Sequence, residues 1–161
     1  HTIHIILKLS GLARKNHDYL LVTKKGEKYL LEGNESSLFM NLLDTYSMKY
    51  NWGYNDAYDI ESVGQIGFLY LLFLLNKFGS KYKDMAFYSE LYFKAFPFFL
   101  ERFDTDDPYR RNDPNNALSV RFFERFAYWF GFIEYQGDNE PPIIKENVKI
   151  RKTELLESLF I

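Results

Sequence analysis

One order of elements occurs twice in this 161-residue chain, and it restricts the fold more than any other feature. A helix-forming run ends at a glycine, Gly11 or Gly131. Two short strand-like runs follow, and a threonine, Thr23 or Thr153, then precedes another helix-forming run. Glycine after an apolar run is typical of a helix C-cap, and threonine is a common N-cap. The similarity of the two segments indicates an internal duplication.

Each segment contains a predicted β-hairpin. The first hairpin pairs residues 13–15 with 19–22 across the polar turn Asn16-His17-Asp18. The second pairs residues 132–135 with 148–151 around a long polar tip. Two short strand-like runs on either side of a polar turn are typical of antiparallel strands, although the first arm, Ala13-Arg14-Lys15, is polar. We expect two small hairpins in an otherwise helical chain.

The remaining apolar runs predict helices at about 36–50, 60–78, 84–103 and 114–130. Pro97 must interrupt the third of these, because proline lacks an amide donor and clashes with the preceding turn. The turn-rich segment 51–59 is the expected linker. The predicted organisation is an incomplete unit plus a helix over 1–50, the linker 51–59, and a second unit over 60–161. The fold class is mainly α with small β-hairpins (α+β).

Composition excludes several protein classes. Hydrophobic residues make up 47 % of the chain, which argues against disorder, and the absence of cysteine excludes disulfides and thiolate metal sites. The most apolar run, residues 66–75, is far shorter than the roughly 20 residues of a membrane-spanning helix. We therefore expect a cytoplasmic protein without a membrane segment. The chain has no initiator methionine and becomes apolar at once, so we expect a piece of a longer protein.

Two runs near the N-terminus resemble winged helix-turn-helix proteins: Leu-Ser-Gly-Leu-Ala-Arg at 9–14 and Tyr-Leu-Leu-Val-Thr-Lys-Lys-Gly at 19–26. The first resembles the end of the recognition helix in that superfamily, and the second resembles its hairpin, which is called the wing. The order of elements over 60–160 resembles the same superfamily. The chain also looks like the C-terminal part of bacterial proteins of unknown function built from tandem winged-helix units. The resemblance implies a tandem winged-helix fold in which the first unit is incomplete and lacks its leading helices.

Many winged helices bind DNA through the third helix and a basic wing, whereas others only join proteins. Residues 1–34 hold six Lys or Arg against three acidic residues, so a nucleic-acid or other anion contact is expected there first. The candidate contacts around the first wing are Arg14, Lys15, Lys24, Lys25 and Lys28. An ordinary lysine-rich surface explains the same residues.

Arg121 and Arg125 are the candidate contacts on the recognition helix of the second unit. Glu124 lies between them, and aromatic residues take most other positions, so a solvated helix edge is the alternative interpretation. The second wing carries Asp138 and Glu140. Acidic residues on a wing argue against phosphate contact, and the net charge of −2 gives no overall attraction to nucleic acid.

No catalytic centre is recognisable, because the chain lacks a GxSxG elbow, a P-loop and a GxGxxG motif. His1 and His4 are spaced as a ligand pair, but no further ligands are indicated nearby. Asp104, Asp106 and Asp107 lack the glycine and the terminal glutamate of a calcium loop, so helix capping explains them better. We expect no enzyme activity, no metal and no cofactor.

The abundant aromatic residues are expected mainly in the core. Phe126, Trp129 and Phe132 should belong to the core of the second unit, and segment 87–99 should be either buried or an exposed patch for a partner. The predicted function is a non-catalytic interaction or architectural module of a larger bacterial protein, with a protein partner or self-association. The alternative is a DNA-binding regulator fragment that uses the basic first wing.

Overall fold

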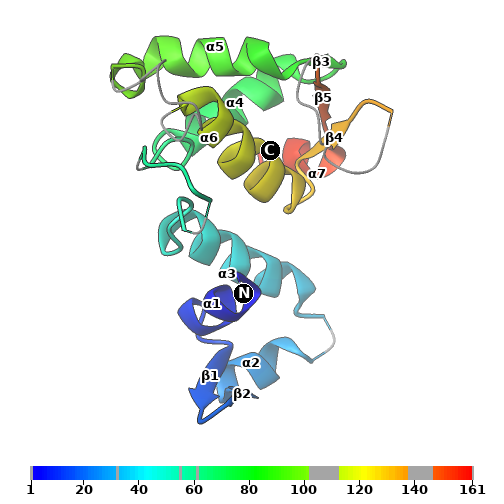
Figure 1. The fold of residues 1–161 in the computed structure, drawn as a ribbon. Helices are drawn as coiled ribbons and strands as arrows, with labels where there is room; N and C mark the ends of the chain where they lie inside the picture. Colours follow the sequence, from blue (N-terminus) through cyan, green and yellow to red (C-terminus); the bar gives the residue numbers. More distant parts are fainter. Residues whose placement is uncertain are drawn as a thin grey trace. The chain divides into compact units, whose positions relative to one another are not determined.

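The computed structural model describes residues 2–31, 33–54, 56–60, 62–101, 113–137 and 147–160. Within these ranges the chain is mainly helical and carries two small antiparallel sheets (Figure 1). The predicted class, mainly α with small β-hairpins, is confirmed. The chain divides into two compact units, the first unit (His1–Asn51) and the second unit (Trp52–Ile161).

The first unit is a short helix that runs into a hairpin, followed by two more helices. Its described elements are α1 (Thr2–Leu9), β1 (Ala13–Asn16), β2 (Tyr19–Val22), α2 (Lys24–Tyr29) and α3 (Glu35–Met48). β1 and β2 are antiparallel, as predicted, with Ala13 opposite Val22. No residue of α1 is buried, so the small core of this unit depends on Leu12 and on the tyrosines Tyr46 and Tyr50.

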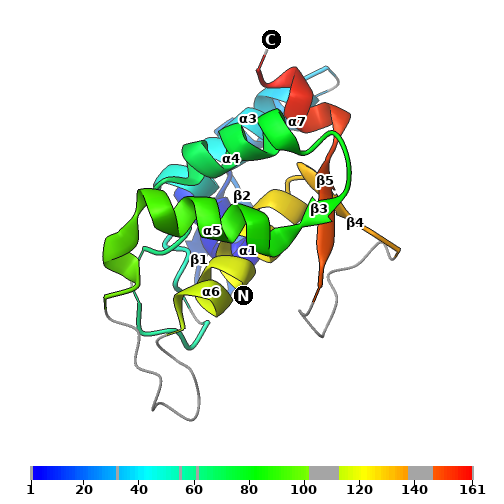
Figure 2. The same cartoon turned by 90° about the horizontal axis from the view of Figure 1, so that it is seen from above.

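The second unit combines helices with a three-stranded sheet. Its described elements are α4 (Phe68–Phe78), β3 (Lys83–Asp84), α5 (Met85–Ala95), the 3₁₀-helix η1 (Pro97–Phe99), α6 (Pro114–Leu118), the π-helix η2 (Ser119–Tyr128), β4 (Ile133–Tyr135), β5 (Lys149–Lys152) and α7 (Glu154–Ser158). The strand order is β3-β5-β4, and both pairs are antiparallel. Figure 2 shows α4 and α5 side by side, with β3 leading into α5. The pairing of β4 with β5 was expected, but the two-residue strand β3 was not.

Aromatic rings fill the core of the second unit. The Trp52 ring lies 4.6 Å from the Phe126 ring, centroid to centroid, and Phe122 and Phe132 pack around them. All four side chains are fully buried, which confirms the prediction for Phe126 and Phe132.

The same prediction is wrong for Trp129, which is 54 % exposed. Trp129 is the C-cap of η2, and its amide donates to the carbonyl of Phe126. The last turn of the helix buries Phe126 and Ala127, whereas Trp129 lies at the exposed end of the helix.

The helix predicted from residue 60 begins only at Phe68. Ser62, Gly64 and Gly67 have φ values of 63°, 82° and 80°, in the left-handed region that a helix cannot continue through. A Cβ at Gly67 would lie 2.5 Å from the Phe96 ring, so this position requires glycine for space as well as for conformation. Ile60, Val63 and Ile66 therefore belong to a non-helical connection, in which Ile60 and Val63 are buried and Ile66 is about half exposed.

Segment 87–99 is partly buried, with Tyr88, Tyr92, Phe93 and Phe99 in the core. Pro97 ends α5 and starts η1, so the predicted interruption is confirmed. The break lets Tyr92 stack on Phe99, with ring centroids 6.0 Å apart and planes 13° apart. Phe98 remains about half exposed, whereas Tyr88, Tyr92 and Phe99 are buried, which favours the core interpretation of this segment.

Candidate functional site

The two repeated segments have the same local geometry. Gly11 and Gly131 have φ values of 74° and 71°, and their carbonyl oxygens accept hydrogen bonds from the Thr23 and Thr153 hydroxyls at 2.7 and 2.6 Å. The amide of Thr23 donates to the carbonyl of Leu12, and the amide of Thr153 donates to that of Phe132, both at 3.0 Å. Each hydroxyl also accepts a hydrogen bond from the first turn of the following helix.

These bonds align the two units residue by residue. Leu12 corresponds to Phe132, and β1 and β2 correspond to β4 and β5. Helix α1 therefore occupies the position of the C-terminal half of η2, the helix on which contacts with a ligand are expected. The two helices can be compared directly as candidate sites.

The start of the helix formed by α6 and η2 is fixed by a side-chain cap. The Asp113 carboxylate accepts hydrogen bonds from the amides of Asn115 and Asn116 at 2.9 and 3.3 Å, and Pro114 occupies the first helical position. An aspartate cap followed by proline matches the preferences of a helix N-terminus. The helix direction is thereby fixed from its first turn.

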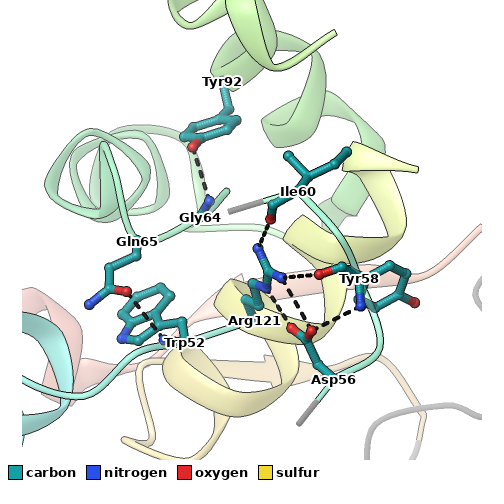
Figure 3. A network of polar contacts seen from close by, with 8 residues as sticks. All are labelled: Trp52, Asp56, Tyr58, Ile60, Gly64, Gln65, Tyr92 and Arg121. Atoms are coloured by element: carbon teal, nitrogen blue, oxygen red, sulfur yellow. Dashed lines mark hydrogen bonds and ion pairs between the residues drawn. The ribbon is translucent and has the colours of Figure 1, made fainter. Parts of the chain in front are cut away.

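Arg121 is the centre of a buried polar network on η2 (Figure 3). Its Nε and Nη2 atoms donate to both carboxylate oxygens of Asp56, at 2.5 and 3.2 Å. Nη1 donates to the carbonyl of Ile60 at 2.5 Å, and Nη2 donates also to the carbonyl of Tyr58 at 3.2 Å. The side chains of Arg121 and Asp56 are 1 % and 0 % exposed, so the pair is removed from solvent.

The expectation that Arg121 contacts a ligand from the helix surface is therefore wrong. The reason lies in segment 51–59, which is expected as a linker but contributes the buried Trp52 and the carboxylate of Asp56 to the second unit. The guanidinium fork matches a carboxylate and two backbone carbonyls, so its donors are used inside the protein. Neither the helix pattern nor the spacing to Arg125 contains this information.

Tyr92 binds the next part of the non-helical segment that precedes α4. Its hydroxyl accepts a hydrogen bond from the Gly64 amide at 3.0 Å and donates to the Ile66 carbonyl at 2.7 Å. The Trp52 amide donates to the Gln65 side chain at 3.2 Å (Figure 3). Arg121 and Tyr92 thus provide hydrogen-bond partners for backbone groups of a partly buried segment outside the named helices and strands. These hydrogen bonds stabilise the fold of this segment.

Arg125 is half-buried, one turn beyond Arg121. With Arg121 buried, η2 presents one arginine where base recognition by a helix ordinarily uses several polar and basic side chains.

The five basic residues of the first wing are all exposed, but the structure does not gather them on one face. Arg14 and Lys15 are neighbours on β1, so their side chains point to opposite faces of the hairpin. The Lys25 ammonium donates to the carbonyl of Ser10 at 2.6 Å, at the end of α1, where a cation stabilises a helix C-terminus. Lys24 and Lys28 lie on one side of α2. The basic residues are therefore divided among three surfaces.

A groove in the first unit was not anticipated from the sequence. It has a volume of about 370 Å³ and lies between α1 and the hairpin. The lining residues are His4, Ile5, Lys8, Lys15, Asp18, Tyr19 and Leu20. Of the predicted site residues only Lys15 lies there. The signal in the sequence is the pair of lysines, Lys8 and Lys15, beside otherwise apolar positions.

Among the described residues no group of three His, Asp or Glu side chains could hold a metal ion. His1 and the loop with Asp104, Asp106 and Asp107 lie outside the described ranges, as do Asp138 and Glu140 of the second wing. No helix in the described part of the chain is both long and apolar enough to cross a membrane.

Comparisons with family models, with curated proteins and with solved structures give no match to this chain.

Proposed function

We propose that the protein is a tandem of winged-helix-type units and serves as a non-catalytic interaction or architectural module of a larger, cytoplasmic bacterial protein. The order of elements supports this fold. In the second unit α4, β3, α5 and the α6–η2 helix precede a hairpin, and β5 lies between β3 and β4. A winged helix has this order of three helices and a wing.

The comparison of the two units supports an incomplete first unit. No residue of α1 is buried, whereas the corresponding helix η2 buries several of its residues, among them Phe122, Phe123 and Phe126. In the second unit β5 pairs with β3 at Lys149 and Ile150. The corresponding edge of β2 has no strand beside it within the described residues. Among its described residues the first unit thus has the final helix, the wing and the following helix, then α3, and no strand that corresponds to β3.

The burial of Arg121 is the observation that carries the functional proposal. A recognition helix reads DNA with exposed side chains, and the most suitable residue of η2 is instead bound to Asp56 and two carbonyls. Three aromatic residues of η2, Phe122, Phe123 and Phe126, are buried in the core. A helix with this distribution is suited to holding a domain together, so the surfaces left for function are those that meet other polypeptides.

Titration of the chain against random and genomic DNA duplexes at physiological salt tests this proposal. We expect only weak, salt-sensitive binding, with a Kd on the order of 10⁻⁶ M or weaker, because exposed lysines interact with phosphates without sequence preference. Selective binding below micromolar Kd would overturn the proposal.

The alternative function is a DNA-binding regulator fragment that uses the first wing. It is favoured by the exposure of Arg14, Lys15, Lys24 and Lys28. Under this alternative, Arg14→Ala should reduce duplex affinity and the slope of its salt dependence. The division of these residues over separate surfaces favours the interaction module.

A further inference from the structure

We propose that the groove of the first unit is a docking site for an acidic, amphipathic peptide segment of a partner protein. This inference rests on the proposed interaction function and specifies its site and its partner chemistry. The two units differ at two equivalent positions, and both of these positions in the first unit line the groove.

The first position is Lys8, which corresponds to Tyr128. The amide of Gly11 donates to the carbonyl of Lys8 at 3.0 Å, and the amide of Gly131 donates to the carbonyl of Tyr128 at 2.9 Å. The same bond in the same C-cap places both side chains at the same point of their helices.

The second position is Lys15, which corresponds to Tyr135. Lys15 pairs with Leu20 across the first hairpin, and Tyr135 pairs with Ile150 across the second. In the second unit the rings of Tyr128 and Tyr135 lie 5.4 Å apart, and Tyr135 and Ile150 are buried. Two rings therefore fill this space in the second unit, whereas two flexible lysines leave it open in the first.

The lining has a distinct chemistry. Ile5, Tyr19 and Leu20 provide an apolar wall. Lys8 and Lys15 are exposed, and neither side-chain ammonium group makes a hydrogen bond or ion pair with any described residue. Asp18 is the only carboxylate among the lining residues, so the groove is positive at neutral pH even with His4 uncharged.

An apolar wall flanked by unpaired ammonium groups is complementary to a peptide in which carboxylates alternate with apolar side chains. A nucleic-acid backbone would use the lysines but leave the apolar wall uncovered, whereas a peptide side chain such as Leu or Phe would cover it. The combination of wall and charge therefore favours an acidic peptide as the occupant.

The test uses the full chain and a labelled probe peptide in which Glu alternates with Leu and Phe. Fluorescence anisotropy gives the Kd, and amide chemical shifts locate the site. We expect saturable binding with shifts confined to α1, β1 and β2. The double variant K8E/K15E should weaken binding at least about tenfold, because two attractive contacts become repulsive. The matched control Arg14→Glu, on the other face of the same strand, should retain the Kd within about twofold.

A second variant, K8Y/K15Y, places tyrosine at the two positions where the second unit has Tyr128 and Tyr135. It leaves Gly11 and Thr23, which cap the helices, unchanged. It should close the groove and abolish peptide binding while the far-ultraviolet circular dichroism spectrum is unchanged. Peptide binding that survives in K8Y/K15Y, or that Arg14→Glu reduces as much as K8E/K15E, would overturn the docking site. A DNA duplex that causes the same shifts at lower concentration than the peptide would also overturn it. A peptide that does not bind removes the docking site but leaves the proposed function standing, since duplex titration tests that function separately.

Discussion

Arg121 on η2 forms a bidentate ion pair with Asp56, a residue 65 positions earlier in the chain. The pair is buried and shares its remaining donors with backbone carbonyls, so every nitrogen of the guanidinium has a partner within the second unit. A buried charge that loses its partner has a high free energy, which makes this contact sensitive to substitution.

We predict that Arg121→Ala lowers the free energy of unfolding by about 3–5 kcal/mol, because it leaves the buried Asp56 carboxylate without its cation and the carbonyls of Tyr58 and Ile60 without the guanidinium donors. The amide of Tyr58 is the donor that remains to Asp56. Chemical denaturation measures this loss. Arg125→Ala is the matched control, and its cost should stay below about 1 kcal/mol. The double variant Arg121→Met/Asp56→Leu should lower the free energy of unfolding by less than the summed losses of Arg121→Met and Asp56→Leu, because no unpaired charge remains. Additive costs would show that the two side chains do not interact.

A second prediction separates two aromatic residues of the same helix. Phe126→Ala should cost roughly 3–5 kcal/mol, because the ring is fully buried against Trp52. Trp129→Ala should cost about 1 kcal/mol or less, because its side chain is more than half exposed. Denaturation curves with equal m-values make the comparison valid. Equal costs for the two variants would contradict the position of Trp129.

The repeated threonine cap gives a third prediction. The Thr153 hydroxyl donates to the Gly131 carbonyl and accepts from the Leu156 amide. Thr153→Val keeps the shape but loses both bonds, so the free energy of unfolding should fall by about 1–2 kcal/mol. Thr153→Ser keeps the hydroxyl and should recover most of that loss. If serine and valine behave alike, the hydroxyl does not stabilise the segment.

A fourth prediction concerns alkaline pH. Burial raises the pKa of Tyr88 to about 12 from its ordinary value of 10.0, and burial likewise raises the pKa of Tyr92 to about 12, against the opposing hydrogen bond from the Gly64 amide. The folded state therefore retains protons that the unfolded chain releases, so the free energy of unfolding should fall as pH rises from about 10 to 12. Denaturation at several alkaline pH values measures the slope. Tyr88→Phe should make the slope shallower, and an unchanged slope would contradict this origin.

Several elements of the fold could be predicted from the sequence because their signals are local. Gly11 and Gly131 mark helix ends, and Thr23 and Thr153 mark helix starts, since each residue type suits one backbone position. Pro97 marks a break for the same reason. The two glycines and the two threonines predict where both hairpins begin and end, and this prediction needs no information on long-range contacts.

Long-range contacts could not be predicted. The burial of Arg121 depends on Asp56, which lies in a segment without periodicity, and the two-residue strand β3 forms only because β5 offers it an edge. The groove in the first unit depends on Lys8 and Lys15 coming together across a helix and a hairpin. Such features need the packed structure.

The state of Arg121 in solution tests the central claim most directly. In ¹⁵N spectra of the full chain, its Nε–H signal should be resolved and slow to exchange with solvent, because the donor is buried and bound to Asp56. Addition of a DNA duplex should leave the signal unchanged, while signals of the exposed lysines shift weakly. A rapidly exchanging Arg121 signal, or one that shifts strongly when the duplex is added, would contradict a structural role and return this helix to nucleic-acid recognition.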